Sequence, residues 1–287
     1  MILAIVGPTG VGKTKLSVEL AKKYNAIVIN CDSMQVYEEL NIGTAKIKES
    51  EKEGVSHFLF DIRKPDEQYS VFDYQKDARN LLRKYQDSNI IFVGGTGLYL
   101  KAVLFDYRFH ETEITLNTYD DKSNEELFQM ALIKDANMEI HQNNRQRLVR
   151  FLNKETENSI IPVPLYEFKI IGLTTDRENL YQRINQRVDT MFENGLLEEA
   201  NQLYEKYENS PALQTAIGYK EFQDYFKQNK TLTELKEEIK KNSRHYAKRQ
   251  YTWFNNQFED IKWLNVDFEN FKNTIDEAIQ IIEKDCN

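Results

Sequence analysis

Eight residues near the start of the chain constrain its fold more than any other segment. They read "GPTGVGKT" at positions 7–14 and follow the apolar run "ILAIV" at 2–6. The spacing is G-x-x-x-x-G-K-[ST], which is typical of a phosphate-binding loop between a buried strand and a helix. The next segment, "KLSVELAKKY", repeats apolar residues at helical spacing. An ordinary glycine turn would need neither neighbour, so we expect a strand, a phosphate-binding loop and a helix in this order.

The residue types in this loop suit the binding of a diphosphate or polyphosphate. Glycines let the backbone turn its N–H groups toward an anion at the N-terminus of the helix. Lys13 adds a positive charge, and the hydroxyl of Thr14 is placed to bind Mg²⁺. The residues that we expect to contact the phosphates are Gly7, Pro8, Thr9, Gly10, Val11, Gly12, Lys13 and Thr14.

Apolar strands and helical patterns alternate through much of the chain. Further strands are expected at 26–30, 57–62, 89–95 and 168–173, with a helix near 72–85. Buried strands separated by helices predict an α/β fold, with a parallel sheet flanked by helices as in P-loop NTPases. From Arg177 onward the pattern is mostly helical.

The segment 106–165 interrupts this alternation. It is more polar and has two helical patterns of its own, near 124–136 and 142–153. A chain of 287 residues is long enough for one large domain with an insertion. We therefore expect a P-loop core, 1–105 with 166–287, and a small, mainly helical insertion domain, 106–165.

Composition narrows the class of protein. With two cysteines, Cys31 and Cys286, the chain has neither a disulfide framework nor a zinc finger. No apolar run has transmembrane length and no signal peptide precedes the first strand, which predicts a cytoplasmic protein without membrane contact. The net charge of −8 by itself argues against a nucleic-acid partner. Binding sites are set by local clusters, however, so the positions of the basic residues decide this question.

Motifs elsewhere separate the classes of phosphate-binding protein. The chain has no N-K-x-D motif for guanine, which argues against a GTPase. An ATPase usually has an apolar strand that ends in a Mg²⁺-linked aspartate. Here the corresponding strand, "IIFV" at 90–93, is followed by "GGTGLY" at 94–99. The sequence therefore argues against a motor protein or a nucleotide switch, whereas a small-molecule kinase remains an alternative.

An aspartate, Asp32, follows the second expected strand in the segment "INCDSMQVY" at 29–37. Ligands of open α/β sheets bind beyond the carboxyl ends of the strands, so this carboxylate should lie near the phosphate loop. There it can act as a general base. Since "DSMQ" can also begin a helix, Asp32 can alternatively be a helix N-cap.

Two arginines, Arg183 and Arg187, lie one turn apart in the helical segment "ENLYQRINQRVDTMF" at 178–192. The apolar stripe of this helix falls on another face, so both guanidinium groups can bind one anion together. Such positive charge is what a departing phosphate group requires. The alternative is a solvent-exposed face on which the arginines pair with glutamates.

Basic residues gather in two further segments, "NNRQRLVR" at 143–150 and "KKNSRHYAKRQYTWF" at 240–254. In the second segment, Tyr246 and Trp253 mark a buried side. The cations expected on its other side are Lys241, Arg244, His245, Lys248 and Arg249. Either cluster can be a solvent-exposed helix face. Two of them in an acidic chain nevertheless favour a groove for a polyanion, because arginine, aromatic and amide side chains together bind the unstacked bases of RNA loops.

Several motifs, taken in order, resemble the tRNA dimethylallyltransferase family, the isopentenyl transferases. The resemblance runs from the first strand to the last helices. The matching segments are "GPTGVGKT", "DSMQVY", "IGTAK" at 42–46, "VGGTGLY", "QRLVR", "RINQRVDTM", "AIGYKE" at 216–221 and "AKRQYTWF". No C-terminal zinc finger follows them, so the match is to the bacterial type.

This resemblance implies an activity. The family transfers a dimethylallyl group from dimethylallyl diphosphate to the exocyclic amine of the adenosine on the 3′ side of the anticodon, and pyrophosphate leaves. The implied partners are dimethylallyl diphosphate and the tRNA anticodon loop, with Mg²⁺ as cofactor and no obligate protein partner. The target base has to be flipped out of its stack, which costs roughly a few kcal/mol.

The resemblance also implies roles for single residues. Asp32 would accept the amine proton, and Thr96 would lie where the two substrates meet. Arg183 and Arg187 would bind the diphosphate together with the phosphate loop, with Arg187 acting in catalysis. The residues expected to contact tRNA are Asp32, Ser33, Met34, Gln35, Gln146, Arg147, Leu148, Val149, Arg150, Tyr219, Lys220, Arg244, Lys248 and Arg249.

Some segments depart from the family pattern. After "QRLVR" the chain reads "FLNKETENS" at 151–159, where the family commonly has an apolar run and Gly-Lys. The acidic stretch 111–126 matches poorly, so it gives no tRNA contacts. The alternatives are a prenyltransferase for free adenine nucleotides, a P-loop kinase and a non-catalytic RNA-binding protein. A free nucleotide would need neither the insertion nor the basic C-terminal helix.

Overall fold

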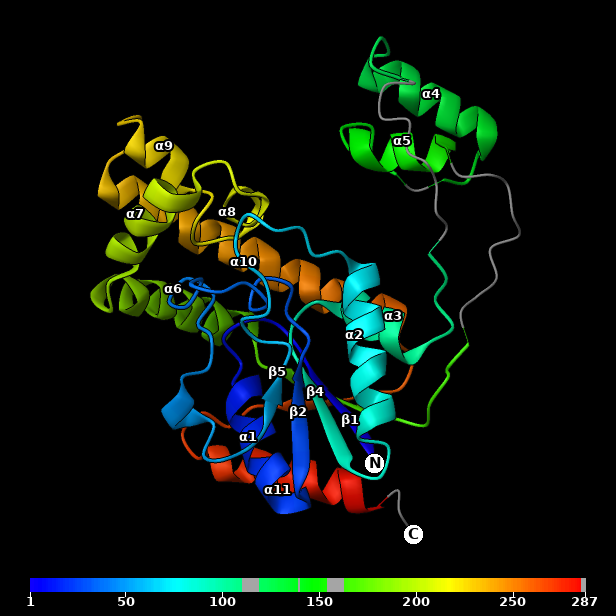
Figure 1. Ribbon diagram of the computed structural model, residues 1–287, viewed down its shortest axis with the longest axis vertical. Helices are drawn as coiled ribbons and strands as arrows, with labels where there is room; N and C mark the ends of the chain where they lie inside the picture. Colours follow the sequence, from blue (N-terminus) through cyan, green and yellow to red (C-terminus); the bar gives the residue numbers. More distant parts are fainter. Residues whose placement is uncertain (110–118, 139, 154–162, 285–287) are drawn as a thin grey trace. The chain divides into compact units, whose positions relative to one another are not determined.

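The computed structural model describes residues 1–109, 119–138, 140–153 and 163–284 (Figure 1). Its chain divides into two compact units, Met1–Tyr107 with Pro164–Asn287 and Arg108–Val163. Among the described residues, no helix combines the length and the apolar character needed to cross a membrane.

The larger unit is built on a six-stranded sheet in the order β3-β2-β4-β1-β5-β6. Every neighbouring pair in it is parallel. The strands are β1 (Ile2–Val6), β2 (Ala26–Asn30), β3 (His57–Phe58), β4 (Asn89–Val93), β5 (Lys169–Thr174) and β6 (Ile261–Asn265). The expected parallel sheet is therefore confirmed, and its carboxyl ends face one side of the molecule.

Two strands differ from the sequence-based expectation. The strand expected at 57–62 ends at Phe58, because Leu59 and Asp61 have positive φ angles of 63° and 50° that break the extended backbone. Strand β6 was not predicted at all. It lies at the edge of the sheet, only Leu264 of its five residues is fully buried, and its apolar signal is correspondingly weak.

Alternate residues along the strands enter two separate cores. Leu3 and Ile5 pack with helices α1 (Lys13–Tyr24) and α11 (Phe271–Lys284) on one face. Ala4, which lies between them in the strand, packs in the core on the other face. The helices that contribute to this second core include α2 (Val71–Lys84), α3 (Gly97–Leu104), α6 (Arg177–Glu193), α7 (Leu196–Tyr207), α8 (Pro211–Thr215), α9 (Phe222–Phe226) and α10 (Leu232–Gln257). Figure 1 shows the sheet between these two layers.

The smaller unit contains the two helices that its sequence predicts, α4 (Asn124–Lys134) and α5 (Arg145–Asn153). Leu127, Ala131 and Leu148 form its core. The guanidinium of Arg145 donates hydrogen bonds to the carbonyl oxygens of Lys122 and Tyr119, at 2.7 and 2.6 Å, which joins the second helix to the segment before the first. Residues 111–118 of the acidic stretch, residues 154–159 and Cys286 lie outside the described residues.

Candidate active site

The phosphate loop joins β1 to α1 as its spacing predicts. Gly12 precedes the helix with a φ angle of 91°, a left-handed conformation that favours glycine. A Cβ atom at this position would also lie only 2.8 Å from the ring of Phe271. Among the described side chains, none caps the N-terminus of α1. The first N–H groups of the helix are therefore left without a side-chain cap, which suits an anion.

Lys13 is half-buried at the start of α1, and its Nζ donates a hydrogen bond of 2.7 Å to the carbonyl oxygen of Pro8. Burial and the neighbouring positive charge of Arg187 lower the pKa of Lys13 to about 7, and the negative charge of Asp32 opposes this shift only in part. A cation held in this way gains a great deal from a bound anion, because the anion supplies the missing countercharge.

The two arginines of α6 lie beside this loop. The guanidinium of Arg187 is half-buried and contacts the carbonyl oxygen of Thr44 at 3.4 Å. Burial lowers the pKa of Arg187, whereas the charge of Asp32 raises it. Arg183 is exposed, donates from Nε to the carbonyl oxygen of Gly10 at 3.1 Å, and lies 3.8 Å from the centre of the Phe268 ring. Arg183 is thus exposed, as the alternative of a solvent-exposed face expects, but among the described residues the ion pairs with glutamates are made by lysines and include neither arginine.

Asp32 follows β2, and no helix begins there. Its Oδ1 accepts a hydrogen bond of 2.9 Å from the backbone N–H of Met34, which is an Asx turn rather than a helix cap. The buried side chain of Asn30 holds the backbone of Asp32 on both sides, at 2.9 and 3.0 Å. The helix-cap interpretation is therefore wrong. Asp32 is a half-buried carboxylate within electrostatic reach of Lys13 and Arg187.

Thr96 links the segment after β4 to the segment after β2. Its Oγ1 accepts a hydrogen bond of 3.0 Å from the backbone N–H of Ser33 and lies 3.3 Å from the hydroxyl of Ser33. Its own N–H donates to the carbonyl oxygen of Cys31. The structure thus brings Thr96 and Asp32, which the sequence separates by two strands and a helix, to neighbouring positions.

Helix α10 contributes two residues to this edge of the sheet that the sequence did not assign to the site. They are Gln250 and Tyr246, the latter expected only on the buried side of the helix. The amide of Gln250 accepts from the N–H of Thr9 at 2.9 Å and donates to the carbonyl oxygen of Gly95 at 3.1 Å. Burial and then the charge of Asp32 raise the pKa of Tyr246, whose side chain lies close to those of Thr96 and Gln250. Their separation of four residues on the buried side of a basic helix was the available signal.

A network around Glu199 of α7 corrects one predicted tRNA contact. Tyr219 has no exposed surface, and its hydroxyl donates to Glu199 and accepts from the N–H of Gly43. The carboxylate of Glu199 also accepts from the N–H groups of residues 41–43. A direct contact between the Tyr219 side chain and tRNA is therefore wrong for this structure. The residue fixes the loop whose Thr44 carbonyl oxygen also accepts from the amide of Gln35, at 3.1 Å.

The other residues expected at tRNA differ in exposure. Lys248 and Arg249 are exposed on α10, whereas Arg244 is half-buried and donates to the side-chain oxygen of Asn185. Half-buried are Ser33, Met34, Gln35 and Lys220. In the smaller unit Gln146, Arg147 and Arg150 are exposed and Val149 is half-buried. Leu148 is fully buried in the core of that unit, so its side chain cannot contact tRNA, and this expectation is corrected too.

A cation at this loop would depend on few protein ligands. Thr14 is exposed in the first turn of α1. No group of three or more His, Cys, Asp and Glu side chains suitable for a metal is found among the described residues. Mg²⁺ commonly keeps waters and binds one or two protein groups together with substrate phosphates. The hydroxyl of Thr14 fits such a site with a diphosphate as the main ligand.

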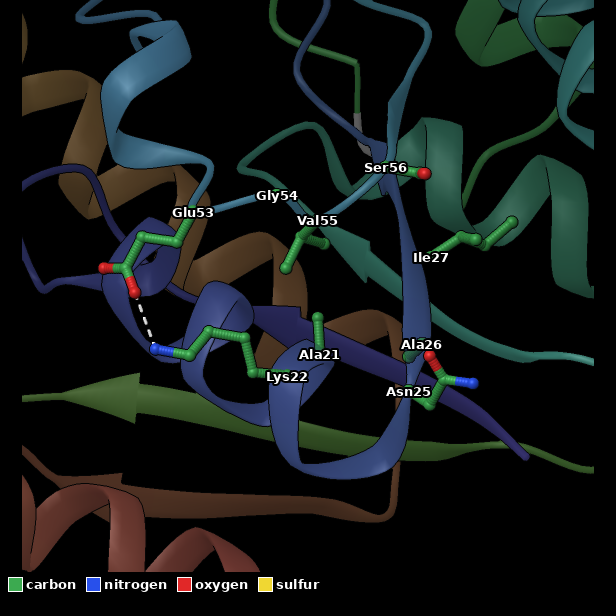
Figure 2. A pocket seen from close by; sticks show the side chains of 9 residues that line it. All are labelled: Ala21, Lys22, Asn25, Ala26, Ile27, Glu53, Gly54, Val55 and Ser56. Carbon is green, nitrogen blue, oxygen red and sulfur yellow. Dashed lines mark hydrogen bonds and ion pairs between the residues drawn. The ribbon is translucent and has the colours of Figure 1, made fainter.

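A pocket of about 260 Å³ lies at the other end of β2, around the C-terminal end of α1 (Figure 2). Its charged residues neutralise each other, since Lys22 and Glu53 form an ion pair of 2.6 Å. Ala26 and Ile27, at the beginning of β2, also line it. It is therefore separate from the edge that holds Asp32.

Known proteins resemble this chain over nearly its whole length. A model of the IPP transferase family matches residues 35–257. The tRNA dimethylallyltransferase of Enterococcus faecalis is 45% identical over an alignment that covers 91% of each chain. The crystal structure of the tRNA isopentenylpyrophosphate transferase of Bacillus halodurans has a TM-score of 0.77 and 41% identity, and the match covers 99% of this chain and 95% of that one. The crystal structure of a eukaryotic dimethylallyltransferase acting on tRNA has a TM-score of 0.81 and 28% identity, and the match covers 99% of this chain and 78% of that one.

Proposed function

The chain belongs to the IPP transferase family, and on this basis we propose that it transfers a dimethylallyl group from dimethylallyl diphosphate to the exocyclic amine of the adenosine on the 3′ side of the anticodon in tRNA. Pyrophosphate is the other product. The observation that supports this function best is the grouping of Lys13, Arg187 and Asp32 at the carboxyl edge of the sheet. Two cations there can take the leaving group, and a carboxylate beside them can take a proton.

The leaving group is the first chemical problem. The carbon–oxygen bond of an allylic diphosphate breaks readily because the resulting cation is stabilised by resonance, provided that the charge on pyrophosphate is neutralised. The uncapped N-terminus of α1, Lys13 and Arg187 supply this positive potential. Fixed charges and dipoles of this kind act where charge develops in the transition state, which is often the largest contribution to catalysis.

The weak nucleophile is the second problem. The lone pair of the adenine amine is delocalised into the ring, so the amine attacks well only as it loses its proton. Asp32 accepts this proton while the carbon–nitrogen bond forms, and the Asx turn with Met34 holds its carboxylate in place. General-base catalysis typically contributes ~10²–10⁴-fold. Thr96, bonded to the N–H of Ser33, keeps this segment next to the site.

Mg²⁺ is the cofactor that we propose for the diphosphate. Thr14 would hold it through the side-chain hydroxyl, together with oxygens of the substrate. Bound there, the ion adds positive charge on the leaving pyrophosphate.

Binding of tRNA is assigned to the exposed basic residues. Lys248 and Arg249 of α10 and Arg147 and Arg150 of α5 present cations to a polyanion. Their contacts with phosphates offset the cost of flipping the target base out of its stack. Since tRNA is the substrate, we expect the protein to act in the cytoplasm.

The decisive experiment compares acceptors. The protein is incubated with dimethylallyl diphosphate, Mg²⁺ and unmodified tRNA, and the digested nucleosides are analysed by mass spectrometry. AMP and ATP replace tRNA in parallel reactions. A dimethylallyl adenosine from tRNA is the expected product. Transfer to AMP or ATP without transfer to tRNA would instead establish a prenyltransferase of free nucleotides, and no transfer to any acceptor would contradict both activities.

A further inference from the structure

Helix α10 has a buried amide in the middle of a basic surface. Gln250 is only 5% exposed, although Lys248 and Arg249 just before it are exposed. Burial of an amide is unfavourable unless its hydrogen bonds are made inside the protein. The amide of Gln250 makes two hydrogen bonds inside the protein, and each joins it to the backbone of a different loop. A side chain in this situation joins the two loops that it contacts.

The two loops are the phosphate loop and the loop after β4. The Oε1 of Gln250 accepts from the N–H of Thr9 at 2.9 Å, and its Nε2 donates to the carbonyl oxygen of Gly95 at 3.1 Å. The contact with the second loop is close, and it depends on the absence of a side chain at Gly95. A Cβ atom on Gly95 would lie 1.9 Å from the Nε2 of Gln250. A larger residue before Thr96 would displace this amide and break the bridge.

The chemistry of the amide matches its two partners. Thr9 offers an N–H and Gly95 offers a carbonyl oxygen, so the bridging side chain needs one acceptor and one donor. Glutamine has both, whereas an ionised glutamate has acceptors only. Tyr246, one turn earlier on α10, lies close to the side chains of Gln250 and Thr96. Helix α10 therefore contacts both the phosphate loop and the loop that carries Thr96.

The distance between these loops matters for the reaction. The diphosphate binds after β1, whereas Asp32 and Thr96 follow β2 and β4, so no single strand fixes their separation. A misplacement of about 1 Å in such a site can cost ~10²-fold in rate. We propose that Gln250 is a positioning residue that holds the phosphate loop and the Thr96 loop at the spacing at which the allylic carbon meets the acceptor amine. This inference rests on the proposed function.

Two substitutions test it. Gln250→Met keeps the size of the side chain and removes both hydrogen bonds. Its kcat should fall at least ~10-fold, while the Kd for tRNA stays at the wild-type value. The matched controls are Gln257→Met and Gln257→Glu, because Gln257 lies two turns further along α10 and its Oε1 accepts an exposed hydrogen bond of 2.6 Å from the Nζ of Lys101. These controls should keep wild-type kinetics.

Gln250→Glu supplies a signature that a purely structural role would not give. An ionised glutamate cannot donate to Gly95, but a protonated carboxyl group again has one donor and one acceptor. Burial raises the pKa of such a carboxyl group, so it becomes protonated in a mildly acidic range. The transfer rate of Gln250→Glu, divided by that of the wild type at each pH, should therefore rise several-fold between about pH 8 and pH 6. The division removes any pH dependence that the wild type shares, and the ratios for Gln250→Met and both Gln257 variants should stay flat.

The outcomes separate this inference from the proposed function. A wild-type protein that transfers no dimethylallyl group to tRNA contradicts the proposed function, and the positioning role with it. A wild-type protein that does transfer, together with a folded Gln250→Met variant of normal kcat, overturns the positioning role alone. If Gln250→Met does not fold, a flat ratio for Gln250→Glu overturns it.

Discussion

A lysine lies near each end of strand β2, but the surroundings of these two lysines shift their pKa values in opposite directions. At the amino end, Lys22 pairs with Glu53 at 2.6 Å, and this hydrogen bond raises the pKa of Lys22 (Figure 2). At the carboxyl end, Lys13 faces Arg187, and burial together with this neighbour lowers the pKa of Lys13 to about 7. The charge of Lys22 is neutralised by a glutamate of the chain itself, whereas the side chain of Lys13 remains available to a bound anion. Substitutions at the two ends of β2 test whether this difference marks function.

Asp32→Asn should have the largest effect. Asparagine keeps the oxygen that accepts from the N–H of Met34, so the turn after β2 remains. Only the ability to take a proton is lost. We expect kcat to fall ~10²–10⁴-fold, with a normal melting temperature and normal tRNA affinity. If the variant turns over at nearly the wild-type rate, Asp32 is structural and the proton leaves by another route.

Lys13→Ala and Arg187→Ala should come next. Each removes one cation from the leaving group, and removal of one such electrostatic interaction typically costs ~10²–10³-fold in kcat. The KM for dimethylallyl diphosphate should rise, while the Kd for tRNA stays nearly unchanged. Lys22→Ala is the matched control at the other end of β2 and should have wild-type kinetics. Equal behaviour of the Lys13 and Lys22 variants in steady-state kinetics would remove the contrast between the two ends.

Removal of positive charges from α10 should weaken tRNA binding by an amount that depends on salt and is smaller than the losses of kcat above. Replacement of Lys241, Arg244 and Lys248 by alanine should lower the slope of log Kd against log salt by ~0.7–0.9 for each tRNA phosphate that the protein no longer neutralises. Binding measured by filter retention at several salt concentrations gives this slope.

A control with the same change in net charge makes that test specific. Lys22, Lys23 and Lys52 all pair with glutamates, so their replacement should leave the salt slope unaltered. An unchanged slope in the α10 variant would show that those residues face only solvent.

The sequence predicts those parts of the site that are formed by contiguous residues. The phosphate loop is defined by eight neighbouring letters, and Asp32 by its place directly after a buried strand. The bridge made by Gln250 joins positions 241 residues apart, and no periodicity in a single sequence reveals such a pair. The edge strand β6 was missed for a related reason, since a half-exposed strand has a weak apolar pattern.

The two corrected tRNA contacts have a different physical cause. Leu148 and Tyr219 belong to segments that match the family as a whole, but neighbouring residues of a segment point in different directions. Arg147 is exposed, whereas Leu148 beside it has no exposed surface. A motif therefore identifies a segment, and only the packing decides which of its side chains can reach a partner.

The smallest expected effect is a pH dependence of diphosphate binding, and it tests the contrast between Lys13 and Lys22 without removing either side chain. In the free protein Lys13 has a pKa of about 7, so it is mostly neutral at pH 8. A bound diphosphate favours the charged form, and binding at pH 8 should therefore take up a proton at Lys13. The affinity should accordingly weaken as pH rises above 7, by at most about tenfold for each pH unit. Calorimetry in two buffers of different ionisation enthalpy measures the proton uptake directly. Lys13→Arg is the control, because arginine stays charged throughout this range and leaves only the titration of the diphosphate itself. If the wild type and Lys13→Arg show the same dependence between pH 7 and pH 9, Lys13 is already charged before the anion arrives, and its difference from Lys22 is one of position alone.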